Sequence, residues 1–216
     1  MNKTDLKLYA ITDRQWLHGA RLSEHVKLAI EGGATMIQIR DKDILSTDSD
    51  AGLKDEYQEA LEIKRICHKH NVPLIINDNV QFAIDIDADG VHLGQDDMNP
   101  AEARKLLGAD KIIGVTAKTV EQAKKAQADG ADYLGSGAVF GSTTKLNAKP
   151  MTKELLREIT AAVDIPVVAI GGINADNAAT LKGTGIAGIA VVGAIFASAD
   201  IKAAAKELAE ICDKML

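Results

Sequence analysis

The chain has 216 residues, of which 46% are hydrophobic and 26% are charged, a composition that excludes disordered and collagen-like chains. Aromatic residues make up only 3%, fewer than proteins need when they stack nucleic-acid bases on aromatic side chains. The formal net charge of −6 excludes a general basic surface for polyanions. Any anion site in this chain must therefore be local.

The sequence shows no sign of membrane insertion or export. No stretch approaches the about 18 apolar residues of a membrane span, and the first ten residues carry charges where a signal peptide is apolar. Cys67 and Cys212 lack a spacing suited to zinc, so we expect two reduced thiols on helices. We expect a cytoplasmic protein with no nucleic-acid or membrane partner, and the oligomeric state is left open.

Eight short apolar runs recur along the chain, with helical periodicity between them. Such runs, rich in Ile and Val, are typical of parallel strands buried on both faces, and they cover residues 6–12, 35–40, 73–78, 90–94, 111–116, 133–137, 166–171 and 188–193. Helix-like segments include 22–30, 57–68, 120–128 and 201–216. No linker divides the chain, and the first strand lacks the glycine pattern of a dinucleotide-binding fold. The sequence predicts an α/β fold, a single (β/α)8 TIM barrel over residues 1–216.

Two connections are longer than a minimal barrel needs. They cover residues 44–52, after the second strand, and 137–151, after the sixth. Both lie at the carboxyl end of the predicted barrel, where loops build active sites. Loops of this length are usually functional lids or flexible insertions, so we expect function for the second and leave both readings open for the first.

The second strand ends in Gln38-Ile39-Arg40-Asp41-Lys42. Alternation places Gln38 and Arg40 on one face, opposite the isoleucines. If the isoleucines pack against helices, Gln38 and Arg40 point into the barrel mouth, where Lys42 could join them. An amide and two cations suit a ligand that bears phosphate. The alternative is an Arg40–carboxylate pair that closes the barrel, with Lys42 solvated.

Carboxylates follow the third and fourth strands. Asp78, Asp96 and Asp97 come from adjacent strand ends and could hold Mg²⁺, which commonly binds through one or two carboxylates plus phosphates and water. Alternatively, Asp78 or its neighbour Asn79 caps the following helix, and Asp96 and Asp97 begin the helix that Pro100 enters at its first turn. His92 faces the barrel interior by alternation, either as a core residue or as a ligand contact.

The later strands end in hydroxyls and glycines. Thr116 ends the fifth strand, and Ser142-Thr143-Thr144-Lys145 follows the sixth, a phosphate-binding composition without P-loop spacing. A helix-flanking threonine and a plain polar lid are the alternatives. Gly171-Gly172 and Val192-Gly193 follow the last two strands, where glycines let backbone amides approach a phosphate; tight turns are the other reading.

Together these residues predict two anion regions. One consists of backbone amides at the last two strands, and the other of cations and a carboxylate-bound metal. A monophosphate and a magnesium-bound diphosphate would fill the two regions. This arrangement points to group transfer with departure of pyrophosphate.

Several of these segments resemble the thiamine-phosphate synthase family, in the same order over essentially the whole chain. They are YAITDR at 9–14, QIRDK at 38–42, Asn77-Asp78, DGVHLGQDD at 89–97, STTK at 142–145 with Ala148, and Gly171-Gly172-Ile173. The family pattern commonly has Ser at the positions of Thr116 and Gly193, and Thr at position 142. Thr116 and Ser142 keep a hydroxyl, whereas Gly193 offers only its backbone N–H.

The resemblance implies a TIM-barrel transferase (EC 2.5.1.3) that requires Mg²⁺. The reaction would join 4-amino-2-methyl-5-hydroxymethylpyrimidine diphosphate to 4-methyl-5-(2-phosphoethyl)thiazole by dissociative substitution, giving thiamine phosphate and pyrophosphate. The resemblance assigns charge stabilisation to Arg40, Lys42 and Lys145, and Mg²⁺ ligation to Asp78 and Asp97. It assigns substrate binding to Gln38, Ile39, Arg40, Asp41, Lys42, Asn77, Thr116, Ser142, Thr143, Thr144, Lys145, Gly172, Val192 and Gly193.

Two other functions compete with this one. A thiazole tautomerase-like isomerase shares the barrel, but that branch typically loses the Q-x-R-x-K set and the Asn-Asp pair, and both are intact here. A non-catalytic phosphate-binding barrel should tolerate loss of the magnesium aspartates, yet Asp78 and Asp97 are present. Both features favour the synthase.

Overall fold

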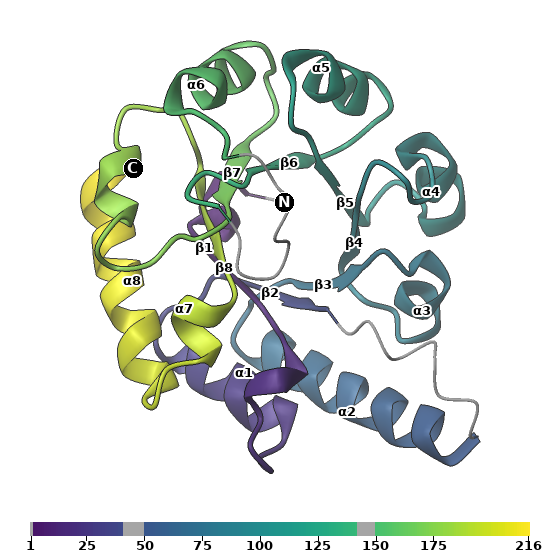
Figure 1. Ribbon diagram of the computed structural model, residues 1–216. Coiled ribbons are helices and arrows are strands. Elements are labelled where there is room, and N and C mark those ends of the chain that lie inside the picture. The colour runs from purple at the N-terminus through teal and green to yellow at the C-terminus, as the bar shows by residue number, and fades with distance from the viewer. Residues whose placement is uncertain (1, 41–49, 142–149) are drawn as a thin grey trace.

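The computed structural model describes residues 2–40, 50–141 and 150–216, without the side chains of residues 50–54. Eight parallel strands pair in chain order, and the first pairs with the last, so that the sheet closes into a barrel (Figure 1). The strands are β1 (Leu8–Ile11), β2 (Met36–Ile39), β3 (Leu74–Asn77), β4 (Gly90–Leu93), β5 (Ile112–Thr116), β6 (Tyr133–Gly137), β7 (Val167–Ile170) and β8 (Gly188–Val191). All eight predicted strands, and the TIM barrel, are confirmed.

Helices surround the barrel on its outer side (Figure 1). They are α1 (Leu22–Glu31), α2 (Asp50–Lys69), α3 (Val80–Asp85), α4 (Pro100–Leu107), α5 (Val120–Ala128), α6 (Lys153–Ala161), α7 (Gly193–Phe196) and α8 (Ile201–Met215), with 3-10 turns η1 (Lys3–Leu6), η2 (Arg14–Trp16) and η3 (Ala178–Leu181). The four predicted helical segments are confirmed. Because α2 begins at Asp50, its first turn takes in the end of the predicted 44–52 connection, and residues 41–49 lie outside the described part of the chain.

The unit after β7 departs from the regular pattern, because η3 takes the place of an α-helix there. Asn174 Oδ1 accepts hydrogen bonds from the backbone N–H groups of Asp176 and Asn177, and Asn177 Oδ1 accepts one from the N–H of Asn174. Such local bonds from side chain to backbone compete with helix formation. The segment after β7 is therefore a compact turn that stays close to the strand end.

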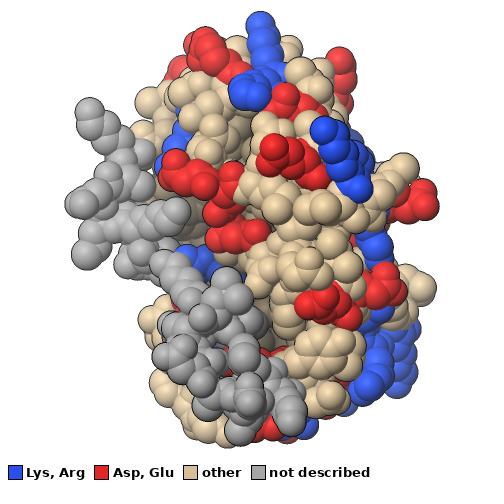
Figure 2. Space-filling model, turned by 90° about the vertical axis from the view of Figure 1, so that its right-hand side faces the viewer, with Lys and Arg blue, Asp and Glu red and all other residues tan. Residues whose placement is uncertain are grey.

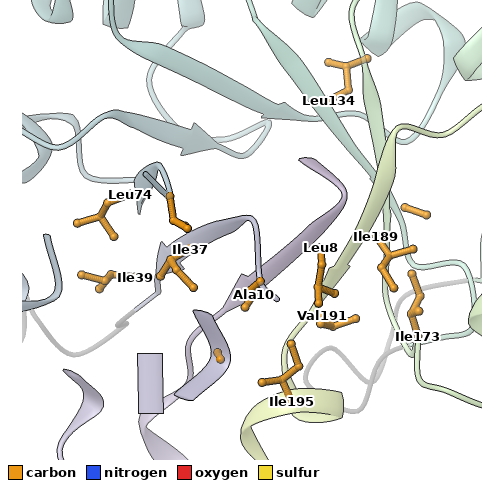
Figure 3. Close-up of a cluster of buried hydrophobic side chains, with 14 of the residues drawn as sticks. Leu8, Ala10, Ile37, Ile39, Leu74, Leu134, Ile173, Ile189, Val191 and Ile195 are labelled. Carbon is orange, nitrogen blue, oxygen red and sulfur yellow. The ribbon is translucent and has the colours of Figure 1, made fainter. Parts of the chain in front are cut away.

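Strand alternation divides the buried side chains into two layers. The inner layer fills the barrel and includes Tyr9, Met36, Ile75, Tyr133 and Val168. The outer layer lies between the strands and the helices; Figure 3 shows part of it, including Leu8 and Ala10 from β1, Ile37 and Ile39 from β2, and Ile195 from α7. The isoleucines of β2 thus face the helices, as the sequence analysis required for Gln38 to face inward.

The two ends of the barrel differ. At the amino end, η1 packs against β1 and β8, and its Leu6 belongs to the inner layer with no exposed surface. A Cβ atom on Gly188 would meet the carbonyl group of Leu6, which shows how tightly this end is filled. In the described residues the amino end of the barrel is thus filled, and the carboxyl ends of the strands are where TIM barrels carry their active sites.

Two features of the described residues bear on the other expectations. Cys67 and Cys212 are free thiols, fully buried in α2 and α8, as expected. None of the helices in the described residues has the length and hydropathy of a membrane-spanning segment. On the face in Figure 2, Asp and Glu side chains are interspersed with Lys and Arg.

Candidate active site

The end of β2 places an amide inside the barrel and a cation at its rim. Gln38 is almost fully buried, and its Nε2 donates a hydrogen bond to the hydroxyl of Tyr9 at 2.5 Å. The backbone N–H of Arg40 donates to Thr12 Oγ1 at 3.1 Å, and the Arg40 charge acts on Asp78. The side chain of Ile39 lies in the outer layer, so a substrate contact there would involve its backbone. Asp41 and Lys42 lie outside the described residues.

Asp78 and Asp97 meet at the ends of β3 and β4. Asp78 Oδ2 accepts a hydrogen bond from Asn77 Nδ2, and Asp97 Oδ2 accepts one from the backbone N–H of Gly94, both at 2.6 Å. Partial loss of water, together with the hydrogen bond and negative charge of Asp97, raises the pKa of Asp78 to about 6, against the lowering effects of Asn77 and Arg40. A cation bound beside Asp78 would favour its ionised form, so the pair of carboxylates suits a cation.

Neither carboxylate serves as a helix cap. Asn79 caps α3 by accepting from the N–H of Phe82 at 2.9 Å, and Asn99 caps α4 by accepting from the N–H of Ala101 at 2.9 Å. Asp78 has a positive φ of 60°, which is uncommon for a residue other than glycine. The alternative that Asp78 or Asn79 caps the following helix is therefore confirmed for Asn79 and not for Asp78. Asp97 does not begin α4, which starts at Pro100.

A continuous hydrogen-bond chain crosses the barrel interior beneath these groups. From Gln38 it passes through the hydroxyls of Tyr9 and Tyr133, which are 2.9 Å apart, to His92 Nδ1 at 3.0 Å. His92 Nε2 lies 3.0 Å from Thr116 Oγ1. Burial lowers the pKa of His92 to about 4, the nearby Asp97 charge notwithstanding, and burial also raises the pKa of both tyrosines. All members of the chain are therefore neutral near pH 7.

Two glycines provide the space for these rings. A Cβ atom on Gly114 of β5 would lie 2.1 Å from the ring of Tyr133, and one on Gly135 of β6 would lie 3.1 Å from the ring of His92. The ring centroids of His92 and Tyr133 are 5.5 Å apart, and those of Tyr9 and Tyr133 are 5.9 Å apart. The barrel interior is thus shaped around these three rings.

The ends of β7 and β8 present backbone instead of charged side chains. Gly171 and Gly172 have positive φ values of 102° and 66°, and a Cβ atom on Gly172 would lie 2.7 Å from the carbonyl oxygen of Phe140. Val192 precedes α7, which begins at Gly193, and the first N–H groups of a helix have no partner within it. Ser142, Thr143, Thr144 and Lys145 lie outside the described residues.

The residues on either side of 142–149 are held at this same edge. The N–H of Phe140 donates to the carbonyl oxygen of Gly171 at 3.0 Å, and the N–H of Met151 donates to that of Ala138 at 2.7 Å. Phe140, Ala138 and Met151 therefore lie close to the glycines that follow β7.

The structure adds residues that the sequence analysis missed. Tyr9 and Tyr133 link Gln38 to His92, Thr12 accepts from the Arg40 backbone, and Gln95 Nε2 donates to the carbonyl oxygen of Thr116 at 2.5 Å. For the tyrosines a signal existed, because alternation places Tyr9 on the inner face of β1. Thr116 bonds to His92, whereas Thr119 caps α5, so the helix-flanking reading of Thr116 is wrong.

The described residues contain no group of three His, Cys, Asp or Glu side chains arranged to hold a metal. Mg²⁺ does not require one, because it keeps several waters and shares substrate phosphates. The oxygen atoms of Asp78 and Asp97 fit this mode of binding. The rim thus combines a cation, two carboxylates, an amide and a hydroxyl on one side, and glycine-lined backbone on the other.

Comparisons with known proteins give one consistent result. A family model described as "Thiamine monophosphate synthase" matches residues 8–195. The thiamine-phosphate synthase of Ruminiclostridium cellulolyticum is 50% identical over 210 residues, 97% of each chain, and that of Clostridium tetani is 48% identical over 204 residues, 94% of each chain. A solved structure of thiamine phosphate pyrophosphorylase from Pyrococcus furiosus superposes with a TM-score of 0.87 at 38% identity, covering 99% of this chain and 98% of that one.

Proposed function

The chain belongs to the thiamine monophosphate synthase family, whose members are transferases, and from this premise we propose the substrates, the metal and the roles of individual residues. The substrates are 4-amino-2-methyl-5-hydroxymethylpyrimidine diphosphate and 4-methyl-5-(2-phosphoethyl)thiazole, and the products are thiamine phosphate and pyrophosphate. The observation that carries the proposal is the meeting of Asp78, Asp97 and the Arg40 charge at the barrel mouth.

Asp78 and Asp97 would hold Mg²⁺ together with the diphosphate of the pyrimidine substrate. When bound, the ion would neutralise charge that develops on the departing pyrophosphate. The donor set supports this assignment, since both groups are carboxylates, neither caps a helix, and partial burial together with the neighbouring Asp97 raises the pKa of Asp78. Arg40 would add a fixed positive charge, and Lys42 and Lys145 would join it.

The reaction needs little proton transfer from the protein. Departure of pyrophosphate leaves a methylene cation that the aminopyrimidine ring stabilises, and the thiazole nitrogen, which carries no proton, then attacks. The residues therefore bind, orient and stabilise charge. His92 is a weak base, since burial lowers its pKa to about 4, and both of its ring nitrogens lie 3.0 Å from hydroxyls of the protein; both features agree with a site that has no general base.

The second substrate would lie on the other side of the mouth. Its phosphate would meet backbone N–H groups at Gly172 and at Val192-Gly193, an arrangement that needs no positive side chain. The glycines that follow β7, and the start of α7 after β8, support this assignment. Ser142, Thr143 and Thr144 would contact the same partner. Gln38, Ile39, Asp41, Asn77 and Thr116 would contact the pyrimidine substrate. The cytoplasmic location remains a prediction from the sequence.

The direct test supplies the purified protein with both substrates and Mg²⁺. We expect release of pyrophosphate and formation of thiamine phosphate in equal amounts. Omission of either substrate should stop both products, and chelation of Mg²⁺ should do the same. Folded protein that forms no thiamine phosphate from verified substrates would overturn the proposal.

A further inference from the structure

The hydrogen-bond chain in the barrel interior joins two places at the mouth that are distant in the sheet. Gln38 is at the end of β2 and Thr116 at the end of β5, while Tyr9, Tyr133 and His92 lie nearer the barrel floor. The register shows the difference in height: Gln38 pairs with Ile11, two residues after Tyr9, and Thr116 pairs with Gly135, two residues after Tyr133. The three rings thus form a bridge beneath the pocket that connects its two sides.

The number of protons available fixes the direction of donation along this hydrogen-bond chain. Gln38 Nε2 donates to Tyr9, whose hydroxyl has a single proton of its own. If Tyr133 also donated to Tyr9, the Tyr9 hydroxyl proton would have no acceptor at a position that is only 1% exposed. A buried donor without an acceptor costs free energy. Tyr9 therefore donates to Tyr133, and Tyr133 donates to His92 Nδ1.

The direction fixes the state of the remaining groups. A neutral imidazole that accepts at Nδ1 has its proton on Nε2, so His92 donates to Thr116 Oγ1. The Thr116 hydroxyl proton is then free to point away from His92. At the other end, Gln38 Nε2 donates to Tyr9, so the amide oxygen of Gln38 remains as an acceptor. The hydrogen-bond chain therefore leaves an acceptor available at Gln38, near the end of β2, and a donor available at Thr116, at the end of β5.

We propose that Tyr9, Tyr133 and His92 are positioning residues that orient Gln38 and Thr116 for the pyrimidine substrate through one hydrogen-bond chain of fixed direction. An aminopyrimidine has an exocyclic amino group that donates and ring nitrogens that accept, which is the complement of such a pocket floor. This inference rests on the proposed function for the identity of the ligand. The direction of the chain, however, is a property of the protein alone.

The first experiment measures the His92 tautomer without any substrate. Long-range ¹⁵N–¹H correlation spectra of histidine-labelled protein distinguish Nε2–H from Nδ1–H, and a His92→Gln variant identifies the His92 signals among the five histidines. We expect Nε2–H in the unsubstituted protein and in Tyr9→Phe, where Tyr133 still donates to His92. In Tyr133→Phe the donor to Nδ1 is lost, and a mixture of tautomers is expected. An Nδ1–H tautomer in the unsubstituted protein would overturn the proposed direction.

The second experiment measures KM for each substrate in the same variants. Both Tyr9→Phe and Tyr133→Phe keep the ring packing but lose one hydroxyl, so KM for the pyrimidine diphosphate should rise by about five- to tenfold, as expected for one lost hydrogen bond. KM for the thiazole phosphate and kcat should change much less. The matched control is Tyr57→Phe, since the Tyr57 hydroxyl donates to Asp85 outside the barrel.

The outcomes separate the two proposals. Equal changes in both KM values, or none in either tyrosine variant, would reduce the chain to a structural role. If Tyr133→Phe does not fold, Tyr9→Phe still tests the Gln38 side of the pocket. If the unsubstituted protein makes no product, the proposed function fails, while the tautomer measurement still decides the direction of the chain.

Discussion

The two sides of the barrel mouth differ in the kind of group that they offer. From β2 to β5 the strands end in ionisable and hydrogen-bonding side chains, among them Arg40, Asp78 and Thr116, whereas β7 and β8 lead into glycine-lined backbone. Side-chain charges can be tuned by their neighbours, as the raised pKa of Asp78 shows. Backbone dipoles do not titrate, but they require exact space and unusual φ angles. We therefore expect the side from β2 to β5 to respond to pH and, on the proposed function, to Mg²⁺, and the side at β7 and β8, the backbone side, to respond to added side-chain volume.

The largest effect should come from removing one carboxylate on the β2–β5 side of the mouth. Asp97→Asn would leave Asp78 as the only carboxylate of the pair, so kcat should fall by more than about a hundredfold, the upper range for residues that merely support a metal ligand. The measurement is initial-rate release of pyrophosphate at several Mg²⁺ concentrations. Asp96→Asn, at the adjacent exposed position, is the matched control and should stay near the unsubstituted rate.

The opposite result for Asp97→Asn would remove Mg²⁺ from the β2–β5 side of the mouth. If Asp97→Asn kept a near-native rate at limiting Mg²⁺, the metal assignment would be wrong. The two carboxylates would then serve only as charge partners of Arg40.

A smaller effect should follow from filling space on the backbone side. Gly172→Ala would place a Cβ atom 2.7 Å from the Phe140 carbonyl oxygen at a φ of 66°, which displaces the backbone around the proposed phosphate position. We expect KM for the thiazole phosphate to rise about tenfold, equivalent to about 1.4 kcal/mol, with KM for the pyrimidine diphosphate nearly unchanged. Steady-state kinetics with each substrate varied in turn measures both values.

Gly183→Ala is the control for this variant. Gly183 also has a positive φ, 77°, but a Cβ atom there has no neighbour within 4 Å. It should lose a similar amount of stability from backbone strain, about 1–2 kcal/mol, without a change in either KM. Equal kinetics in the two variants would indicate that Gly172 is needed for its turn and not for the phosphate.

The two sides also differ in how far the sequence could predict them. Strand alternation correctly placed Gln38 inward and the isoleucines of β2 outward, and the adjacency of strand ends correctly brought Asp78 close to Asp97. The hydrogen bond between Tyr9 and Tyr133 joins residues 124 positions apart, a contact that no local pattern encodes. The replacement of a helix by η3 after β7 depends on asparagine side chains that favour turns and helix caps alike.

The smallest effect should be the pH dependence of stability that arises from Asp78, whose pKa is raised by partial burial and by the neighbouring Asp97. Since the pKa of Asp78 is raised to about 6 from the ordinary 3.8, ionised Asp78 destabilises the fold above pH 6, and this cost disappears as pH falls toward 3.8. Without Mg²⁺, Asp78→Asn should therefore be more stable than the unsubstituted protein at pH 8 and nearly equal at pH 4. Chemical denaturation at the two pH values measures the difference, which added Mg²⁺ should reverse at pH 8, because the ion would bind the ionised pair. A difference that stays constant with pH would show that the pKa of Asp78 is not raised in the folded protein, and the β2–β5 side of the mouth would lose the pH sensitivity that sets it apart from the backbone side.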